Sequence, residues 1–215
     1  MLEGNQPLSP ALRSTLDPGP RFRLHRLMQI PATLTTLPNL LTLGRIAAIP
    51  VICLFIAIGW DWLQWLALLL YIAAAVSDWL DGFLARRMNL NSALGKMLDP
   101  IADKLLVGAL LITLAWTHHL TGWDLIPAVA IMMREIFVSG LREYLGKVDV
   151  DVPVTWLAKW KTTIQLVAIG LLIASPMLLG LVFIGHFLLW VAAILTVWTG
   201  WEYLRGAWPH LAGQG

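Results

Sequence analysis

Cysteine and charged residues are both scarce in this chain of 215 residues. The single cysteine, Cys53, excludes an internal disulfide framework and a cysteine metal site. Charged residues make up only 13% of the chain, whereas a soluble protein carries roughly 25%. A glycine-rich phosphate loop and an HExxH zinc motif are also missing from the sequence. These absences exclude an ordinary soluble domain and a disulfide-stabilised secreted protein.

Hydrophobic residues, by contrast, make up 58% of the chain and gather in long runs. A helix that crosses the hydrocarbon of a bilayer needs about 20 such residues. Short separators rich in Gly, Pro, Asn and Ser lie between the runs, as is typical of helix ends. The six runs cover roughly residues 40–60, 62–86, 95–116, 122–144, 156–175 and 181–205. The sequence therefore predicts an all-α integral membrane protein with six transmembrane helices in one bundle.

The six runs define one predicted membrane domain, residues 35–206, between an N-terminal tail (1–34) and a C-terminal tail (207–215). The N-terminal tail has no signal-peptide pattern, since a short apolar core and a small-residue cleavage site are missing. It ends in a basic cluster made of Arg21, Arg23, His25 and Arg26. This cluster fits either a disordered tail or an interfacial segment that lies on anionic lipid before the first span.

The placement of basic residues predicts the orientation of the chain. An even number of spans puts both termini on one side, and the three connections on the other side lie near Asp61, His118 and Pro176. None of the 15 Lys and Arg residues lies in these connections, so the termini are expected in the cytoplasm. Tryptophans suited to aromatic belts occur near both ends of the runs: Trp60, Trp62, Trp65, Trp116 and Trp123 on one side, and Trp156, Trp160, Trp201 and Trp208 on the other. Short loops and the lack of a targeting segment indicate a bacterial inner membrane.

Four aspartates lie at the cytoplasmic ends of the second and third runs: Asp78, Asp81, Asp99 and Asp103. Residues three or four apart share one face of a helix, so each pair should project together. A short turn near residues 89–92 should make the two helices antiparallel neighbours. A carboxylate inside a bilayer costs on the order of 3 kcal/mol, so the cluster needs a counter-charge. Oxygen ligands without His or Cys suit Mg²⁺ or Mn²⁺, and two such ions assist phosphoryl displacement. The cluster therefore predicts phosphate chemistry on the cytoplasmic side.

The aspartates belong to a longer pattern, D-x-x-D-G-x-x-A-R, eight residues, G-x-x-x-D-x-x-x-D. Gly82 leaves room for a flat group beside the backbone, and Arg86 can offer two donors to a phosphate. This pattern matches, position by position, the signature of the CDP-alcohol phosphatidyltransferases, and the chain resembles that family over about residues 35–206. The fixed positions are Asp78, Asp81, Gly82, Ala85, Arg86, Gly95, Asp99 and Asp103. The segments 38–45, 134–143, 159–163 and 199–205 resemble the branch of the family that acts on glycerol 3-phosphate.

The resemblance implies a membrane enzyme, usually of two subunits, that transfers the phosphatidyl group of CDP-diacylglycerol to glycerol 3-phosphate and releases CMP. It implies two divalent cations, Mg or Mn, held by Asp78, Asp81, Asp99 and Asp103. Asp103 would also take the proton of the attacking hydroxyl. The CDP-lipid would be framed by Asn39, Thr42, Asp81, Gly82, Ala85, Arg86 and Gly95. Membrane lipids and a second copy of the chain are the other expected partners, and no nucleic acid is expected.

The phosphate of the acceptor needs cations, and the candidates are basic residues at the cytoplasmic ends of the spans: Arg134, Arg142, Lys159, Lys161 and Arg205. Arg134 lies about two turns deeper than Arg142, and a deep arginine is costly unless it serves a pocket. Pairing with Glu135 is not expected to explain it, because neighbouring residues on a helix point in different directions. Each of these side chains could instead extend to lipid headgroups.

Three alternatives stay open from the sequence. The acceptor could be another alcohol, such as inositol phosphate, serine, choline or phosphatidylglycerol, because only the flanking segments favour glycerol 3-phosphate. A divalent-cation transporter would also carry acids within its spans, although such sites usually lie near the midplane between related repeats. A catalytically silent lipid-binding or scaffold protein is the third, and the complete motif argues against it.

Overall fold

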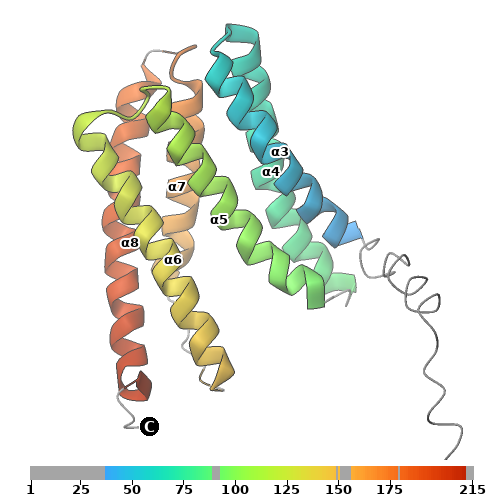
Figure 1. The fold of residues 1–215 in the computed structure, drawn as a ribbon, viewed down its shortest axis with the longest axis vertical. Coiled ribbons are helices and arrows are strands. Elements are labelled where there is room, and N and C mark those ends of the chain that lie inside the picture. Colours follow the sequence, from blue (N-terminus) through green and yellow to red (C-terminus); the bar gives the residue numbers. More distant parts are fainter. Residues whose placement is uncertain (1–36, 89–92, 149, 151–155, 179, 212–215) are drawn as a thin grey trace, which may run out of the picture.

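The computed structural model of the chain describes residues 37–88, 93–148, 150, 156–178 and 180–211, and this part consists of helices and short connections (Figure 1). It contains α3 (Leu37–Ile58), α4 (Asp61–Met88), α5 (Ala93–Trp116), the 3-10 turn η2 (Gly122–Asp124), α6 (Leu125–Lys147), α7 (Trp156–Ala174) and α8 (Leu181–Leu211). Each of the six apolar runs expected from the sequence is therefore a helix. The basic cluster at residues 21–26 lies outside the described residues.

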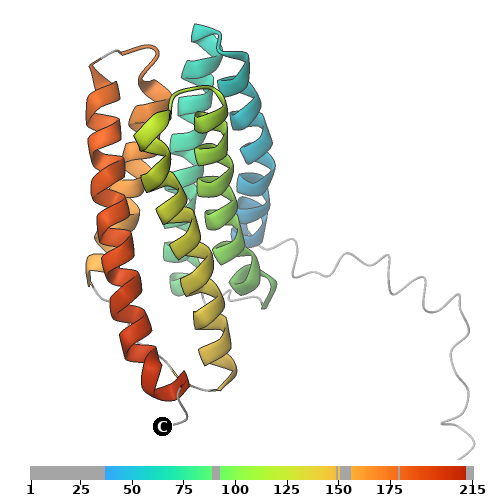
Figure 2. The same cartoon turned by 60° about the vertical axis from the view of Figure 1, so that its left-hand side comes forward.

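Consecutive helices run in opposite directions and are joined by short connections (Figures 1 and 2). The turn between α3 and α4 depends on Gly59, whose φ of +76° lies in the left-handed region. Glycine enters this conformation without the steric cost that a side chain would bring. The Gly59 N–H donates to the carbonyl of Phe55 at 3.3 Å, which closes the last turn of α3. The connection is thus encoded locally by one glycine.

The helices pack as two groups of three that meet along α4, α5 and α7. Helix α3 contacts both α4 and α5, while α8 contacts both α6 and α7. The two groups meet where α7 contacts α4 and α5, and where α5 contacts α6. Across this junction the Tyr71 hydroxyl of α4 donates a 2.7 Å hydrogen bond to the carbonyl of Leu166 in α7. The junction is important for function because it leaves a polar cavity between α5, α6 and α7.

Aliphatic side chains fill the interior over most of the length of the helices. The largest fully buried side chains of this core include Ile52, Ile56, Leu110, Leu114, Ile169, Leu172 and Leu189. A smaller apolar cluster joins α6 to α8 through Val138, Leu145, Tyr203 and Ala207. Because Ala207 is buried there, α8 continues to Leu211 instead of ending near residue 205 as the sequence suggested. Part of the predicted C-terminal tail is therefore helix.

The outer surface of the described helices is strongly apolar. Large aliphatic and aromatic side chains such as Leu54, Leu69, Ile112, Phe183 and Ile194 are exposed. Exposure of so large an apolar surface to water is unfavourable, whereas contact with lipid is not. Three helices are long and apolar enough to cross a membrane: Asn39–Ile58, Trp156–Ala174 and Leu181–Leu211. The other three carry acids or bases toward one end, and their crossing stays a prediction.

Candidate active site

The four aspartates of the sequence motif lie on two helices, α4 and α5. Asp78 and Asp81 belong to the last turns of α4, together with Gly82, Ala85 and Arg86. The structure describes the helix at these five positions but not their side-chain surroundings. Asp99 and Asp103 stand one turn apart on α5, next to Pro100. The convergence of all four carboxylates therefore remains a prediction, and the described geometry concerns the α5 pair.

Helix α3 supplies the direct partners of the α5 carboxylates. The Thr42 hydroxyl donates a 2.7 Å hydrogen bond to Asp99 Oδ1, and Arg45 Nη1 lies 3.2 Å from Asp103 Oδ1. Asn39, Thr42 and Arg45 are all buried, and their three-residue spacing puts them on one face of α3. The Arg45 side chain is fully buried, whereas that of Asp103 is 52% exposed. The buried Arg45 guanidinium thus contacts Asp103 Oδ1, while about half of the Asp103 side chain stays exposed.

Asp99 and Asp103 line a cavity of about 400 Å³ together with cations from α6 and α7. Arg134 and Arg142 reach it from α6, and Lys161 reaches it from α7. The remaining lining residues are Ala75, Pro100, Lys104, Leu106, Val107, Glu135, Ala158, Thr162, Gln165 and Leu166. One cavity therefore combines carboxylates with guanidinium and ammonium groups.

Arg134 is fixed in this wall by α8. Its Nε donates to the carbonyl of Thr196 at 3.1 Å, and its Nη2 donates to Thr199 Oγ1 at 3.2 Å. Gly200 makes this position possible, because a Cβ there would lie 2.9 Å from Arg134 Cγ and 3.2 Å from its Nε. The deep arginine is therefore held by two hydrogen bonds to α8 and does not extend to lipid headgroups.

Glu135 joins Arg134 to Lys161, which corrects the expectation that the adjacent residues would not pair. Glu135 Oε1 accepts a hydrogen bond from Lys161 Nζ and lies 3.6 Å from Arg134 Nη1. Both side chains of α6 are long enough to bend into the same cavity although their Cβ atoms diverge. Lys161 is only 4% exposed, so its charge requires this partner.

The five predicted phosphate-binding residues divide into two groups. Arg134, Arg142 and Lys161 line the cavity, and Arg142 also stacks over the Tyr203 ring, 5.6 Å from its centroid. Lys159 is exposed and does not line the cavity. Arg205 is exposed as well and lies beside Trp201 and Trp208 on α8. The structure thus brings Arg134, Arg142 and Lys161 together and places Lys159 and Arg205 outside this cavity, and a phosphate-binding role for any of the five stays a prediction.

A second cavity of about 510 Å³ adjoins the first between α5 and α6. The two share Pro100, Lys104, Arg134, Glu135 and Arg142. The second cavity adds the apolar side chains of Met97, Ile101 and Val138. Lys104 was not singled out in the sequence; its Nζ donates to the carbonyl of Pro100 at 2.9 Å. The combined space is therefore lined by acids, bases and apolar side chains.

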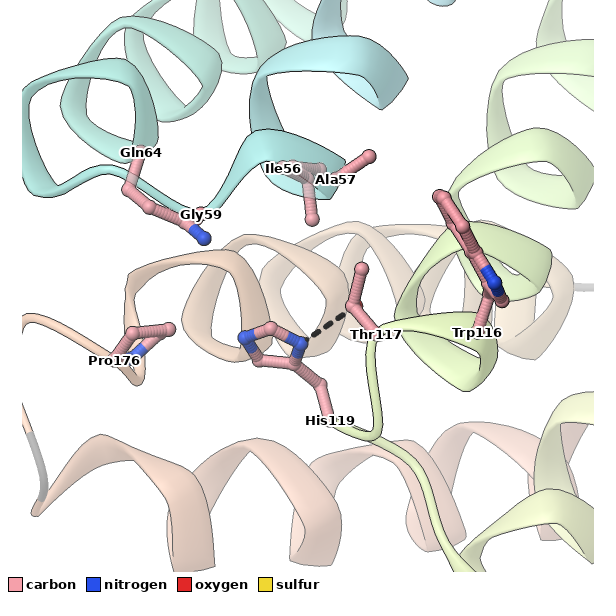
Figure 3. A pocket seen from close by; sticks show the side chains of 8 residues that line it. All are labelled: Ile56, Ala57, Gly59, Gln64, Trp116, Thr117, His119 and Pro176. Carbon is pink, nitrogen blue, oxygen red and sulfur yellow. Dashed lines mark hydrogen bonds between the residues drawn. The ribbon is translucent and has the colours of Figure 1, made fainter.

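A third cavity, of about 470 Å³, lies at the opposite end of the helices, near the connections (Figure 3). Gln64, Thr117 and His119 are its polar lining residues, and Thr117 Oγ1 lies 2.7 Å from His119 Nδ1. Burial lowers the pKa of His119, although a hydrogen bond to the Thr117 backbone opposes this effect. Among the residues that the structure describes, no Asp, Glu, Arg or Lys lines this cavity.

A metal-binding group of three or more His, Cys, Asp or Glu side chains does not occur among the described residues. The predicted ligands Asp78 and Asp81 are not among them, so the donor set is judged on Asp99 and Asp103. Both offer carboxylate oxygens to a cavity with room for a substrate, and Asp103 is half exposed. Hard oxygen donors of this kind fit Mg²⁺ or Mn²⁺ better than a soft metal.

The fold and the cavity together define a helical membrane protein whose polar site combines carboxylates with arginine and lysine side chains. Comparison with known proteins agrees with this class. A profile of the CDP-alcohol phosphatidyltransferase family matches residues 35–198. That range includes the four aspartates, Arg134, Arg142 and Lys161. The chain belongs to the CDP-alcohol phosphatidyltransferase family, whose members act at membranes.

Curated relatives point to one branch of the family. A CDP-diacylglycerol–glycerol-3-phosphate 3-phosphatidyltransferase of Rickettsia bellii is 45% identical over 172 residues, which cover 79% of this chain and 93% of the relative. Proteins of the same name from Shigella flexneri and Cereibacter sphaeroides are 40% and 38% identical, and each alignment covers 83% of this chain and 98% of the relative.

Proposed function

We propose that this chain transfers the phosphatidyl group of CDP-diacylglycerol to glycerol 3-phosphate, giving phosphatidylglycerophosphate and CMP. Its relatives carry that activity in their names. The observation that supports it most directly is the single cavity that Asp99 and Asp103 line together with Arg134 and Lys161. An acceptor with a hydroxyl at one end and a phosphate at the other matches this combination of groups.

Asp103 is the proposed general base. Its carboxylate is half exposed to the cavity while Arg45 holds it through Oδ1. The terminal hydroxyl of the acceptor attacks the phosphorus that carries the diacylglycerol and loses its proton to Asp103. The bond from that phosphorus to the CMP oxygen breaks, and CMP departs with the electron pair. Arg45 offsets the charge of the carboxylate before the proton arrives.

The four motif aspartates are the proposed ligands of two divalent cations, Mg or Mn. Asp78, Asp81 and Asp99 would hold one ion, and Asp78, Asp99 and Asp103 would hold or border the other. Bound there, the ions would supply positive charge for the diphosphate and for the leaving CMP. Thr42 contributes by fixing Asp99 through its 2.7 Å hydrogen bond, which sets the direction of the carboxylate.

The cytidine and its phosphates are proposed to lie near the start of α5 and the end of α4. The proposed contacts are Asn39, Thr42, Asp81, Gly82, Ala85, Arg86 and Gly95. Asn39 is 1% exposed and lies on the same face of α3 as Thr42, which supports its inclusion. Gly95 is buried near the first turn of α5.

Arg134, Lys161 and Arg142 are the proposed site for the acceptor phosphate. Thr199 and the Thr196 carbonyl already fix two donors of Arg134, so its guanidinium needs no reorganisation when a phosphate binds. Glu135 balances the cations in the free enzyme, and a phosphate dianion would share or replace that balance. Lys104 lies close enough to the carboxylates and the cations to assist, since it lines the same cavity.

We also propose six membrane crossings, a homodimer, and a bacterial inner membrane with both termini and the site on the cytoplasmic side. Exposed tryptophans support the crossings, since they occur at both ends of the helices: Trp60, Trp62, Trp65, Trp116 and Trp123 at one end, and Trp156, Trp160, Trp201 and Trp208 at the other. The described basic residues Arg134, Arg142, Lys147 and Lys161 all lie toward the end that holds the cavity.

Release of CMP by purified protein in detergent tests the proposed function. CDP-diacylglycerol would be offered with glycerol 3-phosphate, inositol phosphate, serine or phosphatidylglycerol, each with and without a chelator. Release that depends on glycerol 3-phosphate and on a divalent cation is the expected result. Equal or greater CMP release with another alcohol would show that this alcohol, and not glycerol 3-phosphate, is the acceptor. Metal uptake by sealed vesicles without CMP release would favour a transporter.

A further inference from the structure

We infer that Gln165 on α7 is a specificity-determining residue that hydrogen-bonds the free hydroxyl of the acceptor alcohol. The inference rests on the proposed function, because it places the acceptor phosphate at Arg134 and Lys161. Gln165 lines the same cavity as these two cations, yet it is only 2% exposed. Neither the motif nor the charge pattern of the sequence assigns it a role.

The amide of Gln165 has an unused acceptor. Its Oε1 is buried and has no hydrogen-bond partner among the residues that the structure describes. A buried amide oxygen in that state is destabilising unless a ligand or a water satisfies it. A polar side chain kept at this cost beside a substrate cavity indicates a binding role.

The position of Gln165 fits one particular group of the acceptor. It follows Lys161 by four residues, so both project from the same face of α7, and Gln165 lies about 6 Å further along the helix axis. A phosphate at Lys161 therefore places the carbon chain of glycerol 3-phosphate within reach of the amide. The terminal hydroxyl is used by Asp103, and the central hydroxyl is left to donate to Gln165 Oε1.

The surroundings of Gln165 strengthen such a bond. Leu106, Val107 and Leu166 line the cavity beside it and reduce the access of water. A hydrogen bond in a water-poor site discriminates strongly against a ligand that lacks the partner group, because the protein group is then left unpaired. Gln165 would thus select acceptors that carry a hydroxyl next to the reacting carbon.

Gln64 provides a matched comparison within the same chain. It is also 2% exposed, and its amide oxygen also lacks a partner among the described residues. It lines the cavity at the other end, and Figure 3 shows its amide nitrogen directed toward the side where His119 lies. None of the described residues that line that cavity is Asp, Glu, Lys or Arg, so Gln64 has the same amide without the neighbours that are proposed to bind phosphate.

The test compares two acceptors in three proteins. Glycerol 3-phosphate and 3-hydroxypropyl phosphate share the phosphate and the terminal hydroxyl, and only the first has the central hydroxyl. The ratio of their kcat/KM values would be measured for the unchanged enzyme, Gln165→Met and Gln64→Met. This ratio does not depend on the fraction of active protein, so partial misfolding does not distort it.

The unchanged enzyme and Gln64→Met should favour glycerol 3-phosphate by roughly 5- to 150-fold. Gln165→Met should reduce that preference to less than about threefold, mainly through loss of activity on glycerol 3-phosphate. An unchanged ratio in Gln165→Met would overturn the inference. Should that variant show no turnover, Gln165→Glu decides, since it keeps an acceptor oxygen: a retained ratio supports the role, and a lost ratio overturns it.

Failure of the proposed function would look different. The unchanged enzyme would then release CMP with neither phosphate acceptor, or faster with an alcohol that has no phosphate. Lys161→Met separates phosphate binding from recognition of the central hydroxyl. It should lower kcat/KM for both phosphate acceptors to the same extent and leave the ratio of the two values unchanged.

Discussion

Thr42 on α3 donates a 2.7 Å hydrogen bond to Asp99 on α5, across 57 residues of sequence. Thr42 is 1% exposed, so water does not compete for the carboxylate at that point. Three residues later on α3, Arg45 binds Asp103 in the same way. The first helix therefore sets the direction of both α5 carboxylates before any substrate enters.

The first prediction concerns this hydrogen bond. Thr42→Val keeps the shape of the side chain and removes the donor, so the Asp99 carboxylate loses an interaction worth about 1.5 to 3 kcal/mol. The kcat for CMP release should fall by roughly 10-fold or more, and Thr42→Ser should restore most of it. Thr113→Val on α5 is the control, because among the described residues the Thr113 hydroxyl bonds only to the Ala109 carbonyl of its own helix. Equal losses in the two valine variants would contradict the role of Thr42.

The second prediction concerns the proposed base. Asp103→Asn keeps the size of the side chain but cannot take a proton, so turnover should fall by roughly 10²- to 10⁴-fold. Binding of CDP-diacylglycerol, measured by equilibrium titration, should persist. Asp61→Asn is the control, since Asp61 is exposed at the other end of α4. Near-normal turnover in Asp103→Asn would assign the base to another group.

The third prediction concerns the contact between α8 and Arg134. A Cβ in Gly200→Ala would lie 2.9 Å from Arg134 Cγ, so the arginine must move away from Thr199. The KM for glycerol 3-phosphate should rise by roughly 10-fold, while the KM for CDP-diacylglycerol changes little. Gly140→Ala on α6 serves as the control, because its Cβ would have no neighbour within 4 Å. Equal changes in both KM values would mean a general distortion.

The fourth prediction compares two lysines of α7 that are two residues apart. Lys161 is buried on Glu135 and lines the cavity, whereas Lys159 is exposed outside it. Lys161→Met should raise the KM for glycerol 3-phosphate by roughly 10- to 100-fold, since one buried charge-assisted contact is lost. Lys159→Met should change it by less than about twofold.

Glu135→Gln separates a structural role of this pair from a binding role. Lys161→Met removes one of the two cations that contact the Glu135 carboxylate, and Arg134 is the one that stays. The loss of the Lys161–Glu135 ion pair can by itself lower the stability of the fold. The double variant Lys161→Met with Glu135→Gln removes both charges and should recover thermal stability. Its KM should stay high. A KM that returns to normal with stability would show that Lys161 does not bind the acceptor.

The helices and their order could be predicted from the sequence because each apolar run needs only local information. The end of α3 is an example, because Gly59 adopts the left-handed backbone conformation that stops the helix there. The family could also be recognised from the sequence, because residues 78–103 resemble the signature of the family at every fixed position. Arg134 and Lys161 could be named as candidates since isolated charges in apolar helices are costly.

The partners of these residues could not be predicted in the same way. Arg45 and Thr199 come from helices far along the chain, and nothing in their local sequence says which residue they face. The pairing of Arg134 with Glu135 was missed because helical periodicity describes Cβ directions and ignores the length of flexible side chains. The sequence could not separate Lys159 from Lys161 for a related reason: two residues of one helix that are two positions apart differ by about 200° in direction, and only packing decides which one lines the cavity.

The amino-acid sequence by itself determined the class of protein, the six helices and the acidic motif, since these depend on hydropathy and on spacing within single helices. Only the tertiary structure decided that α3 holds the α5 carboxylates, that α8 fixes Arg134, and that Gln165 shares the cavity with Lys161. The reason is physical: contacts between helices depend on rotation and depth of packing, which many distant side chains set together.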